Sequence, residues 1–304
     1  MRVAAIDCGT NSVRLLVAER VDAVPSELVR TLRLTRLGQG VDATGEFHPE
    51  ALARTFAACD DYAAILADHG VERLRFVATS AARDARNREE FCDGVRDRLG
   101  ITPEVISGDE EAQLSFDGAL GAIPDAATPA LVMDIGGGST ELVLGASGRP
   151  VRGTSLDMGA VRLRERFLAS DPPTAEQVEA ATRYVDGLLD AGGIDLAAAR
   201  TWVGVGGTAT SLSAIVQELP TYDRARVHGS VLGRPTLAAL ATRLLAMPVA
   251  EVLEIPTMVP GRADVICAGA LICARVAARV GADLTVSESD ILDGIVTRLL
   301  AAAP

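Results

Sequence analysis

Apolar and polar positions follow the same order at two places in the chain, one near the N-terminus and one near the middle. At each place an apolar run leads into a short polar break with glycine, and a second apolar run follows. The breaks span residues 7–12 (DCGTNS) and 134–139 (DIGGGS), and both read D-x-G-x-x-S. Because short apolar runs on either side of a glycine turn favour paired strands, each place predicts a strand, a tight turn and a strand.

The pattern beyond these turns also repeats. In the first half it predicts a further strand over residues 28–34, a helix over 49–69, a strand over 74–78 and a helix that begins at Asn87. A strand over residues 104–106 follows, and then a helix that begins with the capping-box sequence Ser107-Gly108-Asp109-Glu110. In the second half it predicts three strands near residues 131, 142 and 151, followed by helices over 160–168 and 174–189. A strand over residues 202–205 comes next, and the turn 206–208 begins another helix. The remaining elements are helices over 236–247 and 262–279, a strand over 283–286 and a helix that begins at Ser289. We therefore expect a duplicated α/β fold in which each half has the order βββαβαβα.

A chain of 304 residues fits about two domains of 100 to 200 residues each. The halves meet near residues 121–128, where a helix ends at a proline and a new strand begins. We expect one domain over residues 1–123 and a second over residues 124–290, flanking a cleft that both glycine turns face. The last helix, residues 291–304, is expected to pack back against the first domain.

Composition narrows the class of protein. The chain is 48% apolar but only 3% aromatic, so its cores should be aliphatic. The longest uncharged stretch, residues 201–217, is interrupted by glycines and hydroxyl residues, which is not typical of a membrane span. No apolar leader is evident at the N-terminus, and we expect a cytoplasmic protein. Five cysteines without a C-x-x-C pair and three scattered histidines argue against a disulfide framework or a zinc site.

The formal net charge is −12, and all 29 basic residues are arginines because the sequence contains no lysine. This excludes a P-loop lysine, a Schiff-base lysine and a kinase-type strand lysine. An acidic chain with few aromatic residues is also a poor candidate for binding nucleic acid. A polyanion would have to be bound by local arginines, loop amides and divalent cations. Arg83, Arg86 and Arg88 form the densest arginine cluster, although a solvated helix start explains Arg86 and Arg88 equally well.

The two glycine turns carry the candidate chemistry. Glycine lets a backbone approach a ligand and present N–H groups to an anion, and a carboxylate at a strand end can hold a hydrated cation. The candidate phosphate-binding residues are Gly9, Thr10, Asn11, Ser12, Gly136, Gly137, Gly138 and Ser139, together with Gly207 and Thr208 in a third glycine turn that opens a helix. The candidate metal ligands are Asp134, Glu141 and Asp7. Arg14 is the counterpart of Glu141 in the first hairpin, where it could contact phosphate, and both could instead be strand-surface residues.

Four longer stretches resemble the exopolyphosphatase and guanosine pentaphosphate phosphohydrolase (Ppx/GppA) family. They are residues 5–16, 77–87 (VATSAARDARN), 105–112 (VISGDEEA) and 133–142 (MDIGGGSTEL), and the resemblance continues through residues 159–163, 204–208 and 259–264. It covers nearly the whole chain and implies the duplicated fold of the actin, sugar kinase and heat-shock chaperone superfamily. Many family members carry further helical domains, so the resemblance is to the short two-domain members.

The resemblance implies that Glu111 is the general base. Its place in the first turn of a predicted helix agrees with this role, because the helix dipole favours an ionised carboxylate. Glu110 is instead assigned to the capping box with Ser107. Arg83 would neutralise charge on the transferred phosphoryl group, with Mg²⁺ or Mn²⁺ as the metal. The implied reaction is hydrolysis of a terminal phosphoanhydride by a water that Glu111 activates.

Several functions compete at this point. The first is an exopolyphosphatase that acts on inorganic polyphosphate, with short chains preferred, and the second is a guanosine pentaphosphate (pppGpp) 5′-phosphohydrolase of the stringent response. The third is a sensor that binds ppGpp or pppGpp without catalysis, against which an intact base argues. A sugar or acetate kinase of the same superfamily is less favoured, because the motif in residues 107–111 favours hydrolysis by water. We expect no nucleic-acid or membrane partner, and the family implies a homodimer.

Overall fold

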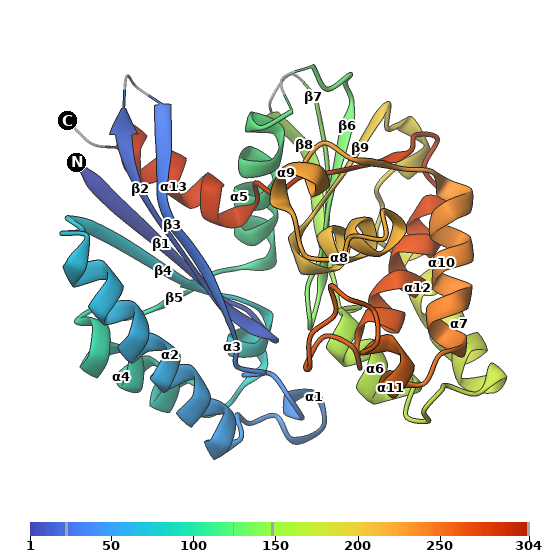
Figure 1. The fold of residues 1–304 in the computed structure, drawn as a ribbon, viewed down its shortest axis with the longest axis horizontal. Coiled ribbons are helices and arrows are strands. Elements are labelled where there is room, and N and C mark those ends of the chain that lie inside the picture. Colours follow the sequence, from blue (N-terminus) through green and yellow to red (C-terminus); the bar gives the residue numbers. More distant parts are fainter. Residues whose placement is uncertain (22–23, 124, 147–148, 303–304) are drawn as a thin grey trace. The chain divides into compact units, whose positions relative to one another are not determined.

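Contacts within the chain divide it into two compact units. The computed structural model describes residues 1–21, 24–123, 125–146 and 149–302. Unit 1 comprises Met1–Leu114 and Ile291–Pro304, and unit 2 comprises Ser115–Asp290 (Figure 1). The predicted start of the second domain at residue 124 and the last two residues of the predicted segment 291–304 lie outside the described residues.

Unit 1 is built on a five-stranded mixed sheet with the order β3-β2-β1-β4-β5. Its strands are β1 (Arg2–Cys8), β2 (Ser12–Val21), β3 (Val24–Leu34), β4 (Arg73–Ala78) and β5 (Glu104–Val105). The first three strands are antiparallel neighbours, and β4 and β5 run parallel to β1. The helices are α1 (Val41–Thr44), α2 (Pro49–Asp68), α3 (Ser80–Asp84), α4 (Arg88–Leu99), α5 (Gly108–Gly121), which continues into unit 2, and α13 (Ile291–Ala301).

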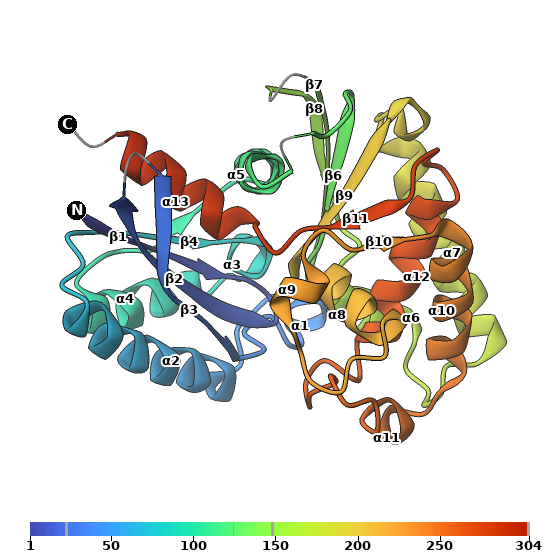
Figure 2. The ribbon, with the colours of Figure 1, turned by 45° about the horizontal axis from the view of Figure 1, so that its top comes forward.

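Alternate residues of β1 pack into two different cores. Ala4, Ile6 and Cys8 join the core that α2 and α4 cover, whereas Val3 and Ala5 join the core that α13 covers. Figure 2 shows these helices on opposite faces of the sheet of unit 1. A strand alternates its side chains between two faces, so a strand that is buried on both faces has the continuous apolar run that the sequence shows.

Helix α2 illustrates how the local sequence sets an element. Pro49 lies in its first turn, where the missing N–H leaves no helical bond unmade, and His48 is the N-cap. The Glu50 amide donates a hydrogen bond to His48 Nδ1 at 3.3 Å. On the buried face, the Tyr62 hydroxyl donates to the Val13 carbonyl of β2 at 2.8 Å, which ties the helix to the sheet.

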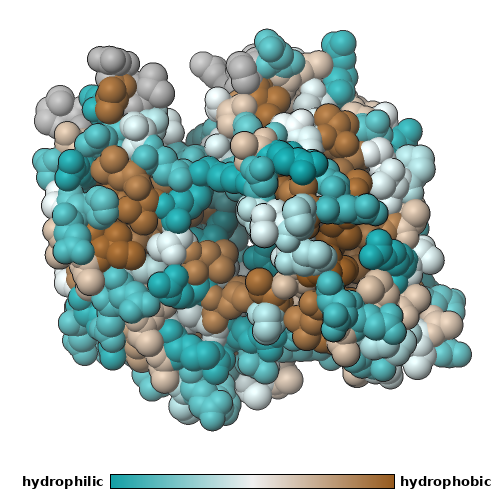
Figure 3. Space-filling model, in the orientation of Figure 1, coloured by the Kyte–Doolittle hydropathy of each residue, from teal (hydrophilic) through white to brown (hydrophobic). Residues whose placement is uncertain are grey.

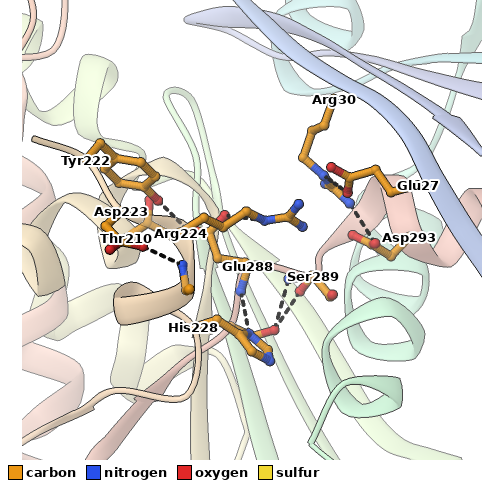
Figure 4. A network of polar contacts seen from close by, with 12 residues as sticks. Glu27, Arg30, Thr210, Tyr222, Asp223, Arg224, His228, Glu288, Ser289 and Asp293 are labelled. Carbon is orange, nitrogen blue, oxygen red and sulfur yellow. Dashed lines mark hydrogen bonds and ion pairs between the residues drawn. The ribbon is translucent and has the colours of Figure 1, made fainter.

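Helix α13 joins the C-terminal end of the chain to unit 1. Its apolar residues share a core with β1 and β2. Gly294 lies so close to α5 that a methyl group there would lie 2.1 Å from the Leu114 carbonyl oxygen. Arg30 of β3 donates to Asp293 at 2.7 Å and also pairs with Glu27 at 2.9 Å (Figure 4). Helix α13 therefore covers a sheet whose strands all come from residues 2–105.

Unit 2 is built on a six-stranded mixed sheet with the order β10-β11-β9-β6-β7-β8. Its strands are β6 (Ala130–Ile135), β7 (Thr140–Ala146), β8 (Arg149–Leu156), β9 (Thr201–Val205), β10 (Val231–Leu232) and β11 (Leu284–Val286). The order β8-β7-β6-β9-β11 repeats the order of unit 1, and β10 is an added edge strand. The predicted α/β class with a duplicated topology is confirmed.

The helices of unit 2 are α6 (Ala160–Phe167), α7 (Ala175–Ala191), α8 (Gly206–Val216), α9 (Arg224–Val227), α10 (Arg234–Ala246), α11 (Val249–Val252) and α12 (Ile266–Ala277), with a 3₁₀ turn at Leu196–Ala198. In Figure 1, α7, α10 and α12 gather on one side of the sheet of unit 2. They share one core with α6, α8 and Trp202, which is fully buried. This core supports α6 and α8, whose first turns border the second glycine turn.

The sequence prediction misses the four short helices α1, α3, α9 and α11, and other elements differ from it as well. Strand β10 has only two residues, too few to show a periodicity. The helix expected over residues 262–279 begins at Ile266, because residues 260–265 form turns and Gly261 has a φ of 86°. Helix α13 begins at Ile291 rather than Ser289, because the Ser289 amide donates to the Ser287 hydroxyl at 3.1 Å and forms a turn first.

Exposed apolar side chains are spread over the described part of the chain. Figure 3 shows a face covered mainly by hydrophilic residues, with separate hydrophobic patches. Among the described residues, the exposed large hydrophobic side chains are scattered along the sequence: Met1, Val21, Leu32, Tyr222, Val231, Leu253 and Val259. No described helix has both the length and the apolar content that crossing a bilayer requires.

Candidate active site

The two glycine turns have the same internal geometry. Loop 1, residues 9–12, joins β1 to β2, and loop 2, residues 136–139, joins β6 to β7. In loop 1 the Gly9 amide donates to the Ser12 carbonyl at 2.9 Å, and in loop 2 the Gly136 amide donates to the Ser139 carbonyl at 3.0 Å. The repeated D-x-G-x-x-S pattern therefore corresponds to a repeated backbone turn.

The segment after β3 holds loop 1 through its carbonyl groups. The amides of Thr35 and Arg36 donate to the Asn11 carbonyl at 3.1 and 3.0 Å, and the Gly38 amide donates to the Thr10 carbonyl at 2.8 Å. Gly38 also packs closely on the loop, since a Cβ there would lie 2.3 Å from Thr10 Cγ2. The carbonyls of loop 1 thus bind to the protein itself.

The segment after β8 holds loop 2 in the same way. The Ala160 amide donates to the Gly136 carbonyl at 2.8 Å, the Val161 and Arg162 amides donate to the Gly137 carbonyl at 2.9 and 3.0 Å, and the Gly159 amide donates to the Gly138 carbonyl at 3.0 Å. Within the part of the chain that the structure describes, the N–H groups of Gly137, Gly138 and Ser139 donate no hydrogen bond. Amides of this kind are donors for an anionic ligand.

The structure brings the two predicted catalytic residues together. Arg83 lies on α3, and Glu111 lies in the first turn of α5. Arg83 Nη1 donates to Glu111 Oε2 at 2.8 Å and to the Ile106 carbonyl at 3.0 Å. Both side chains are largely buried, at 25% and 12% exposed, so this is a charge-assisted hydrogen bond with limited access to water.

Glu110 has a different place from its neighbour. Its amide donates to the Ser107 hydroxyl at 3.2 Å, which is one half of the predicted capping box. Its carboxylate, however, accepts from Arg75 Nη2 at 2.7 Å, and Arg75 also binds Glu104. The prediction that the Glu110 side chain caps the helix is therefore wrong, because a strand arginine supplies a charged partner.

The aspartates that precede the two loops have opposite neighbours. In unit 1, Asp7 is paired across the strands with Arg14, which donates to Asp7 Oδ2 from Nε at 3.0 Å and from Nη2 at 2.6 Å. In unit 2 the equivalent pair is Asp134 and Glu141, which are both acidic. Like charges directly opposite each other destabilise a sheet, so a cation beside Asp134 and Glu141 would relieve the repulsion.

The carboxylates of Asp134 and Glu141 are well supported. Glu141 is 2% exposed and accepts from the Ser155 hydroxyl at 2.6 Å. The Ser115 hydroxyl donates to Asp134 Oδ2 at 3.5 Å, and Gly206 makes room for Asp134, since a Cβ at residue 206 would lie 2.5 Å from Oδ1. No group of three or more histidine, cysteine, aspartate or glutamate residues among those described could hold a metal ion. Two carboxylates fit Mg²⁺, which usually keeps several waters and takes one or two protein carboxylates.

The third glycine turn is bound to the base of loop 2. Gly206 begins α8, and the Thr208 hydroxyl donates to the Ile135 carbonyl at 3.0 Å. Arg262 Nη1 donates to the Gly207 carbonyl at 3.0 Å and to the Ser211 hydroxyl at 2.9 Å. Sequence reasoning gave Arg262 and Arg162 no role. The only signal was that both lie in stretches that carry the family resemblance, residues 259–264 and 159–163.

A further polar network in unit 2 joins α9 to the segment after β11 (Figure 4). The Tyr222 hydroxyl donates to Glu288, and Arg224 Nε pairs with Glu288 Oε2 at 3.3 Å. The Glu288 amide donates to His228 Nδ1 at 3.2 Å. Although the Tyr222 residue is 47% exposed, partial burial at the hydroxyl and then the negative charge of Glu288 raise the pKa of this phenol.

Comparison with known proteins shows similarity along the whole chain. The Ppx/GppA phosphatase family matches residues 16–301. Exopolyphosphatase 2 of Mycobacterium tuberculosis is 48% identical over 98% of this chain and 98% of its own length. Exopolyphosphatase 1 of Mycobacterium bovis is 30% identical over 90% of this chain and 80% of its own length.

Solved structures also resemble this protein over nearly its whole length. The crystal structure of an exopolyphosphatase-like protein superposes with a TM-score of 0.94 at 42% identity, covering 99% of each chain. The Ppx/GppA family member of Aquifex aeolicus superposes with a TM-score of 0.84 at 32% identity, covering 99% of this chain and 98% of its own.

Proposed function

Because the chain belongs to the Ppx/GppA phosphatase family and is a hydrolase, we propose that it is an exopolyphosphatase that releases terminal orthophosphate from inorganic polyphosphate, with short chains preferred. The observation that carries this proposal is the state of loop 2. Its carbonyls are bound by residues 159–162, while its amides at residues 137–139 remain as donors. The name of the M. tuberculosis relative supports polyphosphate as the substrate.

Loops 1 and 2 would bind phosphate groups through backbone amides. The carbonyls of both loops are fixed to neighbouring segments, so the amides are positioned before substrate arrives. Positioned donors cost little reorganisation when charge develops on a transferred phosphoryl group, whose loose transition state gains from placement and electrostatics. Gly207 and Thr208 remain proposed phosphate residues, with the Thr208 hydroxyl serving mainly to attach α8 to β6.

Asp134 and Glu141 would hold Mg²⁺ or Mn²⁺, directly or through water. When the metal is bound, it would neutralise negative charge on the phosphate groups. Asp7 stays a candidate ligand from the sequence alone, and its pairing with Arg14 means that a protein cation already balances its charge. Asp134 and Glu141, which face each other across two strands of unit 2, are therefore the favoured pair of metal ligands.

Glu111 would orient and deprotonate the attacking water, and Arg83 would neutralise charge on the transferred group. Because Arg83 binds Glu111 in the structure, a phosphate that binds Arg83 competes with this carboxylate. Substrate binding would thus loosen the ion pair and make Glu111 available to water. Glu111 would then act as a base only after substrate has bound, which suits a hydrolase that must position its water beside a bound phosphate.

The test compares two neighbouring glutamates. Glu111→Gln should lower the turnover of phosphate release by about 10² or more while leaving polyphosphate binding largely intact. Glu110→Gln is the matched control, since its carboxylate binds Arg75 and lies outside the proposed chemistry. Equal turnover in the Glu111 variant and the control would remove Glu111 from the mechanism.

Substrate choice is tested by initial rates with Mg²⁺ on short-chain polyphosphate, long-chain polyphosphate and pppGpp in parallel. Faster release from polyphosphate supports the proposal, and the reverse ranking would favour pppGpp hydrolysis. No release from any substrate would favour a ppGpp- or pppGpp-binding sensor. The homodimer and the cytoplasmic location stay predictions, and a sedimentation measurement that finds a monomer would overturn the first.

A further inference from the structure

Arg162 is a buried cation directly behind loop 2. It lies in the first turn of α6, and the residue is only 9% exposed. Its Nε atom donates to the Gly138 carbonyl at 2.8 Å. The carboxylate of Asp157, which is itself 71% exposed, lies 3.9 Å from Nη2. Burying an arginine is costly, which makes its contact with the loop worth explaining.

The backbone of the same segment reinforces this contact. The amides of Ala160, Val161 and Arg162 belong to the first turn of α6, where helical N–H groups lack partners within the helix. All three donate to carbonyls of loop 2. The positive end of the helix therefore acts on the Gly136 and Gly137 carbonyls, and the guanidinium acts on the neighbouring Gly138 carbonyl.

Hydrogen bonds to the carbonyls of loop 2 also polarise its peptide groups. A carbonyl that accepts strong hydrogen bonds makes the N–H group of the same peptide a better donor, because hydrogen bonds in a chain polarise one another. The Gly137 carbonyl shares a peptide with the Gly138 amide, and the Gly138 carbonyl shares a peptide with the Ser139 amide. These are two of the amides that donate no hydrogen bond within the described part of the chain.

Loop 1 has a simpler arrangement. Its carbonyls receive hydrogen bonds from the backbone amides of Thr35, Arg36 and Gly38. Arg36 has a φ of 51°, a left-handed conformation that a non-glycine residue adopts only at some cost. In unit 2 the segment after β8 approaches loop 2 through a glycine, Gly159. The same segment also contributes a side-chain donor, Arg162.

We infer that Arg162 is a positioning residue for anion binding. It fixes the peptide planes of loop 2 from behind and places a positive charge there, so that the loop amides bind a phosphate more strongly, although Arg162 does not itself touch the substrate. The inference rests on the proposed function, because it takes loop 2 to be a phosphate site.

The experiment measures binding separately from catalysis. Binding of inorganic tripolyphosphate is measured by calorimetry in the Glu111→Gln background, with Arg162→Met and Arg162→Lys as second changes. Arg162→Met should weaken binding about tenfold, equivalent to about 1.4 kcal/mol. Arg162→Lys should recover most of this loss, since an ammonium group keeps both the charge and a donor. In the otherwise unchanged enzyme, Arg162→Met should raise KM for polyphosphate far more than it lowers kcat.

Arg164→Met is the matched control. Arg164 lies on the same helix and donates to carbonyls outside loop 2, namely those of Leu168 and Ser170, so its loss should leave tripolyphosphate binding unchanged. Thermal unfolding is followed for every variant. Unchanged binding in Arg162→Met would overturn the inference. Equal losses in the methionine and lysine variants, with matching falls in melting temperature, would also overturn it and assign Arg162 a purely structural role. If the Glu111→Gln parent itself binds no tripolyphosphate, the proposed function fails and the inference fails with it.

Discussion

Gly159 is the position at which a single methyl group should disturb catalysis most directly. A Cβ at residue 159 would lie 2.2 Å from the carbonyl carbon and oxygen of Gly137 and 2.4 Å from the Gly138 nitrogen. Ordinary contacts of a Cβ begin near 3.4 Å, and these neighbours are backbone atoms that cannot rotate away. Loop 2 in Gly159→Ala would therefore have to move by about 1 Å, and a displacement of that size can lower a rate by about 10².

The assay is kcat/KM for polyphosphate together with thermal or denaturant unfolding. We expect kcat/KM to fall about 10²-fold, and overpacking to cost about 1–3 kcal/mol of unfolding free energy. Gly187→Ala is the matched control, because Gly187 lies on α7 with no atom within 4 Å of the added methyl group. It should raise stability by about 0.5–1 kcal/mol without changing activity.

The result that would refute the reasoning is a Gly159→Ala enzyme with unchanged kcat/KM. Such a result would mean that loop 2 can shift without loss of function, and that its amides do not bind the reacting phosphate. A fall in activity that only mirrors the fraction of unfolded protein would also refute it. The measurement of unfolding at the assay temperature separates these cases.

The remaining predictions concern stability and reactivity. Gly294→Ala places a methyl group 2.1 Å from the Leu114 carbonyl oxygen and should lower the unfolding free energy by about 1–3 kcal/mol, measured by denaturant titration. Burial opposes ionisation of Asp186, but hydrogen bonds from Arg275 and a second arginine lower the pKa of its carboxyl. Its stabilisation is therefore present at neutral pH and lost as pH falls through the lowered pKa, so Asp186→Asn should cost about 1 kcal/mol at neutral pH. That cost should shrink below about pH 4, as urea unfolding at several pH values would show. Burial raises the pKa of all five thiols, so a thiol reagent near neutral pH should label half-exposed Cys92 first and the other four only on unfolding, as mass spectrometry would show.

The sequence predicts the fold well where a signal is local. The D-x-G-x-x-S breaks between apolar runs locate both hairpins, and the helical periodicity before Gly70 locates α2. Local signals are less reliable where a distant residue competes. Asn87 has the position of an N-cap, yet its side chain accepts from the Phe47 amide at 2.8 Å, 40 residues away. Sequence reasoning alone cannot tell which partner an amide will take.

The candidate site has the same limit. Asp7 and Asp134 occupy equivalent places in one motif, but their neighbours across the sheet are Arg14 and Glu141. Only the strand register shows that one aspartate is already paired with a cation and the other faces a second carboxylate. Gly159 gives no signal beyond its place in a stretch with family resemblance, because its importance depends on the approach of Gly137 and Gly138, which lie far from it in the sequence. The assigned roles of Glu111 and Arg83 stay predictions, and their ion pair gives them a geometry to test.

The return of α13 to unit 1 has a consequence for the newborn polypeptide on the ribosome. Val3, Ala5 and Leu16 lie on one face of the first sheet, and their apolar cover comes from α13, which is translated after all of unit 2. At about 5–20 residues per second, the intervening segment Ser115–Asp290 delays that cover by on the order of ten seconds or more. Unit 2, whose chain is continuous, can finish folding while one apolar face of the first sheet is still exposed to solvent. The nascent first sheet is therefore the stage of biogenesis at which a chaperone has most to protect.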